Sequence, residues 1–305
     1  MINGITQLRK IPGIIAVSRV DFSGDIEMML KDRLTPGLFE SARKNSKKIH
    51  AYKIVYKSNG HAVAGFIIEP RNGKKLPCII YNRGGSKDFG SIRIGRLFLD
   101  LADMADWGYV VIASQYSGNG GSEGRDEMGG KDVDDVLNLR KILKAYPYAD
   151  DSRIGMYGHS RGGMMTYLSL AKVKWIKAAA IGAGLADEVG APKFRHGWDM
   201  HQKEMYGGSL IEKKKRSALY WTDAFSKKTP ILLMHGSADW RVNPLDSLRM
   251  AEKLYLKKVP FRLVFFEGAD HGLSEFECET KIQIKDWFEK YLKKDTKIDL
   301  CPHGK

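Results

Sequence analysis

Residues 153–173 read RIGMYGHSRGGMMTYLSLAKV, and this stretch decides the fold. An apolar run that predicts a strand leads through a glycine-rich turn directly into an apolar run that predicts a helix. In such a junction a central serine stands above the end of a sheet, with the N-terminus of the helix directed at it. Ser160, inside the G-x-S-x-G pattern GHSRG, is therefore the candidate nucleophile. Gly162 and Gly163 allow the strand and the helix to approach closely.

A second match to the same pattern, GGSEG at residues 120–124, has Ser122 at its centre. The strand before it is predicted to end at Tyr116, but a glycine-rich loop follows, and no apolar helix pattern starts before Val133. Ser122 has the letters of the motif without the strand-to-helix turn that gives the motif its chemistry. We therefore predict Ser160 as the nucleophile and Ser122 as part of a connecting loop.

Strand and helix patterns alternate on both sides of residues 153–173. Two β-rich runs flank Asn59-Gly60, the strongest short signal for an antiparallel hairpin. Further strands are predicted at 76–82, 109–116, 153–158, 176–184, 231–236 and 261–268, and helices at 94–107, 132–146, 162–173, 247–258 and 281–294. This alternation predicts an α/β fold: a mostly parallel twisted sheet with helices on both faces and an N-terminal antiparallel hairpin.

The predicted domain organisation is simple. Residues 49–305 are predicted to form one catalytic domain, in which residues 185–228 interrupt the alternation and form a small helical excursion. Residues 1–48 are polar and weakly periodic, and we expect them to form an N-terminal arm packed on the body.

Composition predicts an ordinary globular protein. The 305 residues are 43% hydrophobic and carry a formal net charge of +14, and three cysteines lie far apart without disulfide or zinc spacing. No window approaches the about 20 apolar residues of a membrane span. The densest basic run, KKKR at 213–216, is short and typical of a solvated surface. We expect a cytoplasmic protein with no membrane contact, no nucleic-acid partner, no metal and no cofactor.

An acid and a base follow two later strands. Asp239 comes just after the strand at 231–236, and His271 just after the strand at 261–268. Because the carboxyl ends of parallel strands meet at one edge of a sheet, both side chains are expected near Ser160, in the order serine, acid, histidine. Alone, Asp239 could cap a helix and His271 could be an ordinary loop histidine. Asp270 is an alternative acid, but it is poorly placed to accept from the ring of its neighbour.

Other residues complete the candidate site. The oxyanion hole is predicted from the backbone N–H of Arg161 and from the loop NRGGS after the strand at 76–82, which holds Arg83, Gly84 and Gly85; an ordinary glycine turn is the alternative. His159 and His235 are expected to shape the turn and the strand end. His196, Asp199 and His201 match no strong metal motif. Candidate pocket walls, for which core packing is an equal alternative, are Phe89, Trp198, Tyr206, Trp221 and Trp240.

Five segments in register resemble the α/β-hydrolase superfamily. Within it, the chain is similar to the catalytic domain of prolyl oligopeptidase-type serine peptidases and to the dienelactone hydrolase and acetyl esterase branches. The segments are YNRGGS, SGNGGSEG, GMYGHSRGGMMT, LLMHGSADWRVNP and EGADHGL, and the resemblance spans about residues 50 to 295. It implies an acyl-enzyme mechanism with Ser160, Asp239 and His271 as nucleophile, acid and base.

Two departures from the family pattern bear on the substrate. Oligopeptidases often supply an oxyanion tyrosine where this chain has Arg83, so the resemblance implies only backbone donors there. The region before residue 50 could not hold the N-terminal β-propeller of larger members. We therefore expect a serine hydrolase that acts on carboxylic esters, with cleavage of short peptides as the alternative. A catalytically idle hydrolase fold that binds a polyanion is a third possibility.

Overall fold

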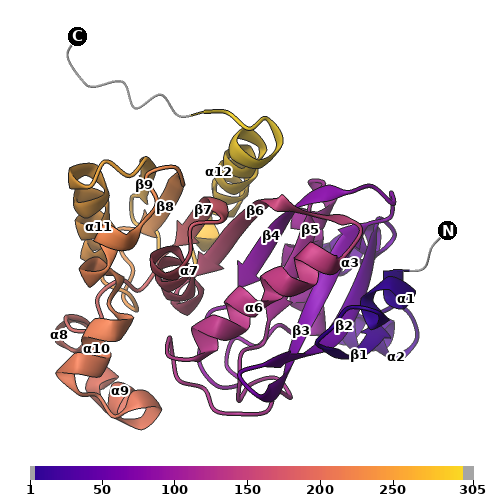
Figure 1. Cartoon of the computed structure of the whole chain (residues 1–305), viewed down its shortest axis with the longest axis horizontal. Helices are drawn as coiled ribbons and strands as arrows, with labels where there is room; N and C mark the ends of the chain where they lie inside the picture. The colour runs from indigo at the N-terminus through magenta and orange to yellow at the C-terminus, as the bar shows by residue number, and fades with distance from the viewer. Residues whose placement is uncertain (1–3, 298–305) are drawn as a thin grey trace. The chain divides into compact units, whose positions relative to one another are not determined.

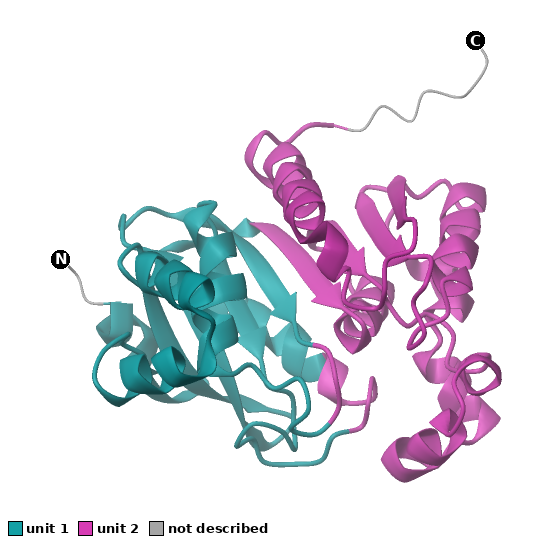
Figure 2. Ribbon diagram, turned by 180° about the vertical axis from the view of Figure 1, so that it is seen from behind, with its two compact units in different colours: residues 1–83, 87–126, 134–152 teal, residues 84–86, 127–133, 153–305 magenta. Residues whose placement is uncertain are grey.

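A computed structural model describes residues 4–297, which fall into two compact units (Figure 2). Unit 1 comprises residues 1–83, 87–126 and 134–152, and unit 2 comprises residues 84–86, 127–133 and 153–305.

Unit 1 is built on a sheet whose strand order is β1-β2-β3-β5-β4 (Figure 1). The strands are β1 (Ile14–Arg19), β2 (Ile49–Ser58), β3 (His61–Pro70), β4 (Leu76–Asn82) and β5 (Val110–Ser114). Strands β1, β2, β3 and β5 pair antiparallel in turn, and β4 pairs parallel with β5. The predicted hairpin is confirmed: Asn59 and Gly60 join β2 to β3 with φ of 49° and 84°. Two successive positive φ values are typical of the tight turn that suits a twisted hairpin.

The described helices of unit 1 include the two predicted at 94–107 and 132–146, and three in residues 1–48 for which no bounds were predicted. They are α1 (Gly4–Arg9), α2 (Asp25–Arg33), α3 (Pro36–Ser46), α4 (Ile94–Arg96) and α5 (Ala102–Asp106), together with most of α6 (Asp132–Ala145). The helix predicted at 94–107 is present, but its middle, Leu97–Leu101, is π-helical. Residues 1–48 contain α1, β1, α2 and α3, and β1 pairs with β2. The domain boundary at residue 48 stays a prediction.

Unit 2 contains four parallel strands in the order β6-β7-β8-β9. They are β6 (Ala149–His159), of which residues 149–152 belong to unit 1, β7 (Ile176–Gly182), β8 (Ile231–Gly236) and β9 (Phe261–Phe266). Between them lie α7 (Arg161–Lys172), α11 (Leu245–Leu256) and, after β9, α12 (Glu277–Phe288). Three short helices follow β7: α8 (Ala191–Phe194), α9 (Trp198–Tyr206) and α10 (Leu210–Arg216).

Helices cover both faces of the sheet in unit 2. On β9, Arg262 stacks over the Trp287 ring of α12, whereas Phe265 lies beside His235, whose ring is bonded to Ser247 of α11. Residues an odd number apart on a strand point to opposite faces, so α12 and α11 lie on opposite sides of β9. The loops at the carboxyl ends of β6, β8 and β9 carry the candidate catalytic residues.

A buried carboxyl group in unit 1 predicts a pH-dependent stability. Glu69 accepts a hydrogen bond from Tyr146 Oη at 2.9 Å, and burial, only partly offset by hydrogen bonds from Tyr146 and Tyr52, raises its pKa to about 7. The folded protein therefore holds this proton more tightly than the unfolded chain, in which the pKa is about 4.5. The extra stability is fully present below the unfolded pKa and is lost as the pH rises through 7.

We expect Glu69→Gln to remove this dependence. Relative to the wild type, the variant should gain about 3 kcal/mol in the free energy of unfolding between about pH 4.5 and pH 8. Denaturant titrations at both pH values measure the difference, and Glu40→Gln, an exposed glutamate of α3, is the control. An equal effect of Glu69→Gln at the two pH values would contradict the assignment.

Candidate active site

Ser160 occupies a strained turn between β6 and α7. Its φ is 59° and its ψ is −123°, a conformation that costs free energy for a residue with a side chain. A Cβ on Gly158 would lie 2.1 Å from the Gly162 carbonyl oxygen, and one on Gly163 would lie 2.5 Å from Gly184 Cα. Only glycine fits at these two positions, so the strand can turn sharply into the helix. The strand–turn–helix context predicted for Ser160 is present.

Three side chains of unit 2 form one hydrogen-bonded chain. Ser160 Oγ lies 2.9 Å from His271 Nε2, and His271 Nδ1 lies 2.7 Å from Asp239 Oδ2. The carboxylate accepts from Nδ1–H, which leaves Nε2 to accept from the serine hydroxyl. The structure therefore brings the three predicted catalytic residues into the geometry that activates a serine.

The Asp239 carboxylate accepts from four donors and is fully buried. Its Oδ2 accepts from His271 and from His235 Nε2 at 3.0 Å, and its Oδ1 accepts from the backbone N–H groups of Arg241 and Val242 at 2.8 and 3.0 Å. Burial alone would raise the pKa of Asp239, but hydrogen bonds from His235 and His271 outweigh it and hold the pKa well below its usual range. The group thus stays ionised beside the imidazole.

His159 supports the base from the other side. Its Nε2 lies 2.8 Å from the backbone oxygen of His271, and the two rings are 5.1 Å apart between centroids. Burial lowers the pKa of His159 to about 4, so the ring is neutral at neutral pH and donates Nε2–H to the carbonyl. His159 thus bonds to the backbone that carries His271, and its predicted part in shaping the turn at Ser160 stays a prediction.

Ser122 lies in a loop of unit 1. Its Oγ accepts a hydrogen bond from the backbone N–H of Ala64 on β3 at 2.9 Å, and its own N–H donates to the Asn119 carbonyl at 2.9 Å. Gly120 and Gly121 have positive φ, and no helix begins before α6 at residue 132. The loop predicted around Ser122 is confirmed.

Two glycines of the predicted oxyanion loop belong to unit 2. A Cβ on Gly84 would lie 3.1 Å from the His159 carbonyl oxygen and 3.6 Å from Ser160 Cβ, so this residue lies directly against the candidate nucleophile. The Gly85 carbonyl accepts from Arg161 Nη1 at 2.9 Å. These contacts tie the loop to the first residue of α7.

Arg83 has a different environment in unit 1. Its side chain is fully buried, donates through Nε and Nη2 to the Gln115 carbonyl at 3.1 and 3.0 Å, and stacks over the Tyr116 ring. Its guanidinium is thus committed to the protein interior. A contribution of Arg83 to the oxyanion hole through its backbone stays a prediction.

Arg161 forms a buried ion pair that the sequence did not reveal. Its Nη2 lies 2.6 Å from Asp132 Oδ2, and both side chains are at most 1% exposed. In the sequence, Asp132 stands in the first turn of a predicted helix, where the helix dipole alone favours an acidic residue. Nothing in the sequence therefore pointed to a partner for it. The pair joins the start of α6 to the start of α7 within unit 2.

We expect Arg161→Met to destabilise the protein by about 3 to 5 kcal/mol, because it leaves the Asp132 carboxylate buried without its partner. Arg161→Met combined with Asp132→Leu should recover most of that stability. It should not recover kcat, because the bond from the Arg161 side chain to the Gly85 carbonyl is still missing. Thermal unfolding and steady-state kinetics on both variants measure the two effects. Full recovery of kcat in the double variant would show that the tie to Gly85 is irrelevant.

Two of the five aromatic residues proposed as pocket walls surround a buried acid. Trp198 Nε1 and Tyr206 Oη donate to Glu188 Oε2 at 2.9 and 3.0 Å, and Gln202 donates to the same oxygen. Burial raises the pKa of Glu188. Sequence reasoning missed Glu188, which has no motif around it.

The other three aromatic residues are exposed. Phe89, in unit 1, is 67% exposed; in unit 2 Trp221 and Trp240 are 42% and 60% exposed. Trp221 donates to the Lys214 carbonyl, and Trp240 stacks with Arg241. A substrate contact by any of the five stays a prediction.

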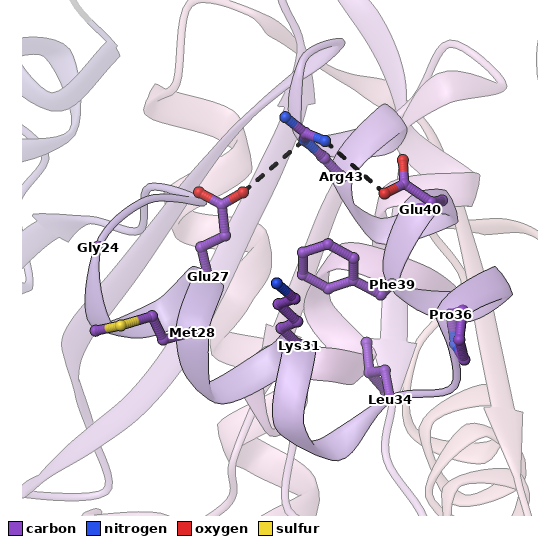
Figure 3. Close-up of a pocket in the computed structure, with 9 residues that line it drawn as sticks. All are labelled: Gly24, Glu27, Met28, Lys31, Leu34, Pro36, Phe39, Glu40 and Arg43. Atoms are coloured by element: carbon purple, nitrogen blue, oxygen red, sulfur yellow. Dashed lines mark ion pairs between the residues drawn. The ribbon is translucent and has the colours of Figure 1, made fainter.

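A pocket of about 750 Å³ lies in unit 1 between α2 and α3 (Figure 3). Arg43 pairs with Glu27 and Glu40 at its rim, each at 3.8 Å, and Phe39 and Leu34 line the apolar side. Its lining has no serine, cysteine or histidine, so it cannot form a serine–histidine or cysteine–histidine pair.

Within residues 4–297, no group of three or more histidine, cysteine, aspartate and glutamate side chains is arranged to hold a metal ion. Over the same range, no helix has the length and hydropathy needed to cross a membrane.

Comparison with known proteins identifies the family. Residues 97–295 match the prolyl oligopeptidase family, and a Bacillus subtilis protein named uncharacterized peptidase YtmA is 30% identical over 250 residues, covering 80% of this chain and 95% of that protein. The chain belongs to the prolyl oligopeptidase family. Dipeptidyl-peptidase 5 of Porphyromonas gingivalis is 27% identical over 245 residues, and the match covers 72% of this chain but only 34% of that protein.

Solved structures of this type have the same fold. An acylaminoacyl peptidase of Pyrococcus horikoshii superposes with a TM-score of 0.71 at 24% identity over 89% of this chain, and a puromycin-hydrolyzing peptidase of Mycobacterium tuberculosis with 0.66 at 22% over 80%. Each match covers 44% of the longer chain. The predicted α/β-hydrolase fold is thereby confirmed, and this member of the prolyl oligopeptidase family is a serine hydrolase.

Proposed function

We propose that this serine hydrolase cleaves short peptides through an acyl-enzyme, with Ser160 as nucleophile, His271 as base and Asp239 as acid. The observation that carries the proposal is the continuous hydrogen-bonded chain from Ser160 Oγ through the His271 ring to Asp239 Oδ2, at 2.9 and 2.7 Å. Family membership supports the same assignment.

The reaction follows from this geometry. His271 Nε2 removes the hydroxyl proton while Ser160 Oγ attacks the carbonyl carbon, and Asp239 stabilises the imidazolium that forms. The backbone N–H groups of Arg161 and of Gly84 or Gly85 are proposed to bind the oxyanion. His271 then gives its proton to the leaving amine, and the acyl group stays on Ser160. Water attacks this ester with His271 as base, and its collapse releases the acid and restores the serine.

A peptide substrate is favoured over the carboxylic ester predicted first. The relatives reported above bear names of peptidases, including one called a dipeptidyl-peptidase and one called an acylaminoacyl peptidase. Because the chain spans only about a third of the dipeptidyl-peptidase, that enzyme's own specificity is not carried over.

Turnover of matched substrates tests the choice. We expect kcat/KM to be higher for short peptidyl anilides than for p-nitrophenyl esters with the same acyl group, after correction for the uncatalysed rates. A preference for the esters under that correction would favour the carboxylesterase alternative instead.

A catalytically idle fold that binds a polyanion, suggested by the net charge of +14, is disfavoured by membership in the prolyl oligopeptidase family. Covalent labelling by a fluorophosphonate would rule it out. Absence of labelling together with salt-dependent binding of nucleic acid would support it.

A further inference from the structure

A second histidine contacts the acid of the proposed triad. His235, near the end of β8, is fully buried, and its Nε2 lies 3.0 Å from the same Oδ2 atom of Asp239 that accepts from His271. The proposed mechanism does not use this ring.

The neighbours of His235 determine where its hydrogen lies. Nε2 has the Asp239 carboxylate at 3.0 Å and the Val242 carbonyl oxygen at 3.3 Å, and both can only accept. Nε2 therefore carries the hydrogen. Nδ1 lies 2.6 Å from Ser247 Oγ on α11, and in a neutral ring it accepts from that hydroxyl. Ser247 is 1% exposed, so water does not compete for this bond.

We propose that His235, oriented by Ser247, is a positioning residue that holds the Asp239 carboxylate and sets the pH at which His271 becomes an effective base. This inference rests on the proposed function. Both His235 and His271 donate a hydrogen bond to Oδ2, so the negative charge of this oxygen is divided between two donors. Without that donor the carboxylate would stabilise the His271 imidazolium more strongly, and deprotonation of His271 would require a higher pH.

Other charged and titratable groups lie near this network and stay unchanged in the variants below. They are His159 at the end of β6, Arg195 after α8, Arg241 beside the acid, Asp270 before the base and Asp246 at the start of α11. Asp246 is directed away from the histidines, because its Oδ2 accepts from the backbone N–H groups of Ala186 and Asp187.

Two substitutions of His235 test its bond to Asp239, because one keeps the donor at the position of Nε2 and the other removes it. Glutamine places its amide nitrogen near the position of Nε2 and can still donate to Asp239, whereas asparagine reaches only the position of Nδ1 and cannot. We expect His235→Asn to move the acid limb of the kcat/KM profile upward by roughly half to one pH unit and to lower its plateau about tenfold. His235→Gln should keep the wild-type limb.

Ser247→Ala removes the hydrogen bond between the Ser247 hydroxyl and His235 Nδ1 and keeps the His235 ring. It should shift the limb in the same direction as His235→Asn but by less, and it keeps the inference testable if His235→Asn does not fold. Ser237→Ala is the matched control, because the Ser237 hydroxyl lies in the loop after β8, where it accepts from the Gly268 N–H at 2.8 Å. Its acid limb should equal that of the wild type.

The rate of inactivation by a fluorophosphonate, measured across the same pH range, reports the state of His271 without a peptide substrate. An upward shift in His235→Asn and Ser247→Ala, with rescue by His235→Gln, supports the inference. If the variants have lower melting temperatures but the same acid limb of the pH profile as the wild type, His235 has only a structural role and the inference is overturned. Failure of the wild type to be labelled at Ser160 would instead refute the proposed function.

Discussion

Ser160→Ala is expected to abolish fluorophosphonate labelling and to lower kcat/KM by about 10⁵- to 10⁶-fold, because no other hydroxyl lies against His271 Nε2 in the described site. The fold should be unaffected, because the substitution removes only the hydroxyl group and introduces no new atoms that could clash. Labelling with a tagged probe, followed by peptide mapping, measures the loss and locates the adduct.

Ser122→Ala is the matched control for this result. Both serines stand at the centre of a G-x-S-x-G pattern, but the Ser122 hydroxyl accepts from the Ala64 N–H rather than facing a histidine. Its loss should cost about 1 kcal/mol of stability and leave labelling intact. Labelling that survives in Ser160→Ala and disappears in Ser122→Ala would reverse the assignment of the nucleophile.

The contrast between the two serines shows what a sequence pattern can and cannot predict. The five-letter pattern was equally good at both positions, and the flanking strand and helix periodicity separated them. That periodicity is local, so it could be read along the chain. The same holds for the hairpin at Asn59-Gly60 and for β4, whose bounds match the predicted strand.

Contacts between distant segments were not predictable in this way. Strand β1 lies in the N-terminal region that had no readable pattern, and it became a strand through pairing with β2. The ion pair of Arg161 with Asp132 and the bond of His235 to Asp239 depend on how separate elements pack. Asp239 and His271 could be predicted because parallel strands bring their carboxyl ends to one edge.

Asp239→Asn is expected to lower kcat by about 10⁴-fold while leaving the fold intact. The wild-type carboxylate accepts from two donors on each oxygen: the backbone N–H groups of Arg241 and Val242 on Oδ1, and the two histidines on Oδ2. An asparagine has one accepting oxygen, and the fixed backbone donors retain it.

The amide –NH₂ of the variant then faces the rings of His271 and His235. Two donors cannot share one bond, so His271 must place its hydrogen on Nε2, where it can no longer take the proton of Ser160. Steady-state kinetics measure the loss in kcat, and the rate of fluorophosphonate labelling should fall in parallel.

Asp270→Asn is the control, because this acid is the sequence neighbour of His271 and its Oδ1 accepts a local bond from the Gly272 N–H at 2.7 Å. Asparagine keeps that acceptor, so kcat should stay within about threefold of the wild type, as expected for a substitution away from buried networks. If Asp270→Asn loses as much activity as Asp239→Asn, the acid has been assigned to the wrong residue. If only Asp239→Asn loses activity strongly, the carboxylate after β8 controls the tautomer of His271. It does so through Oδ2, the oxygen to which both histidines donate.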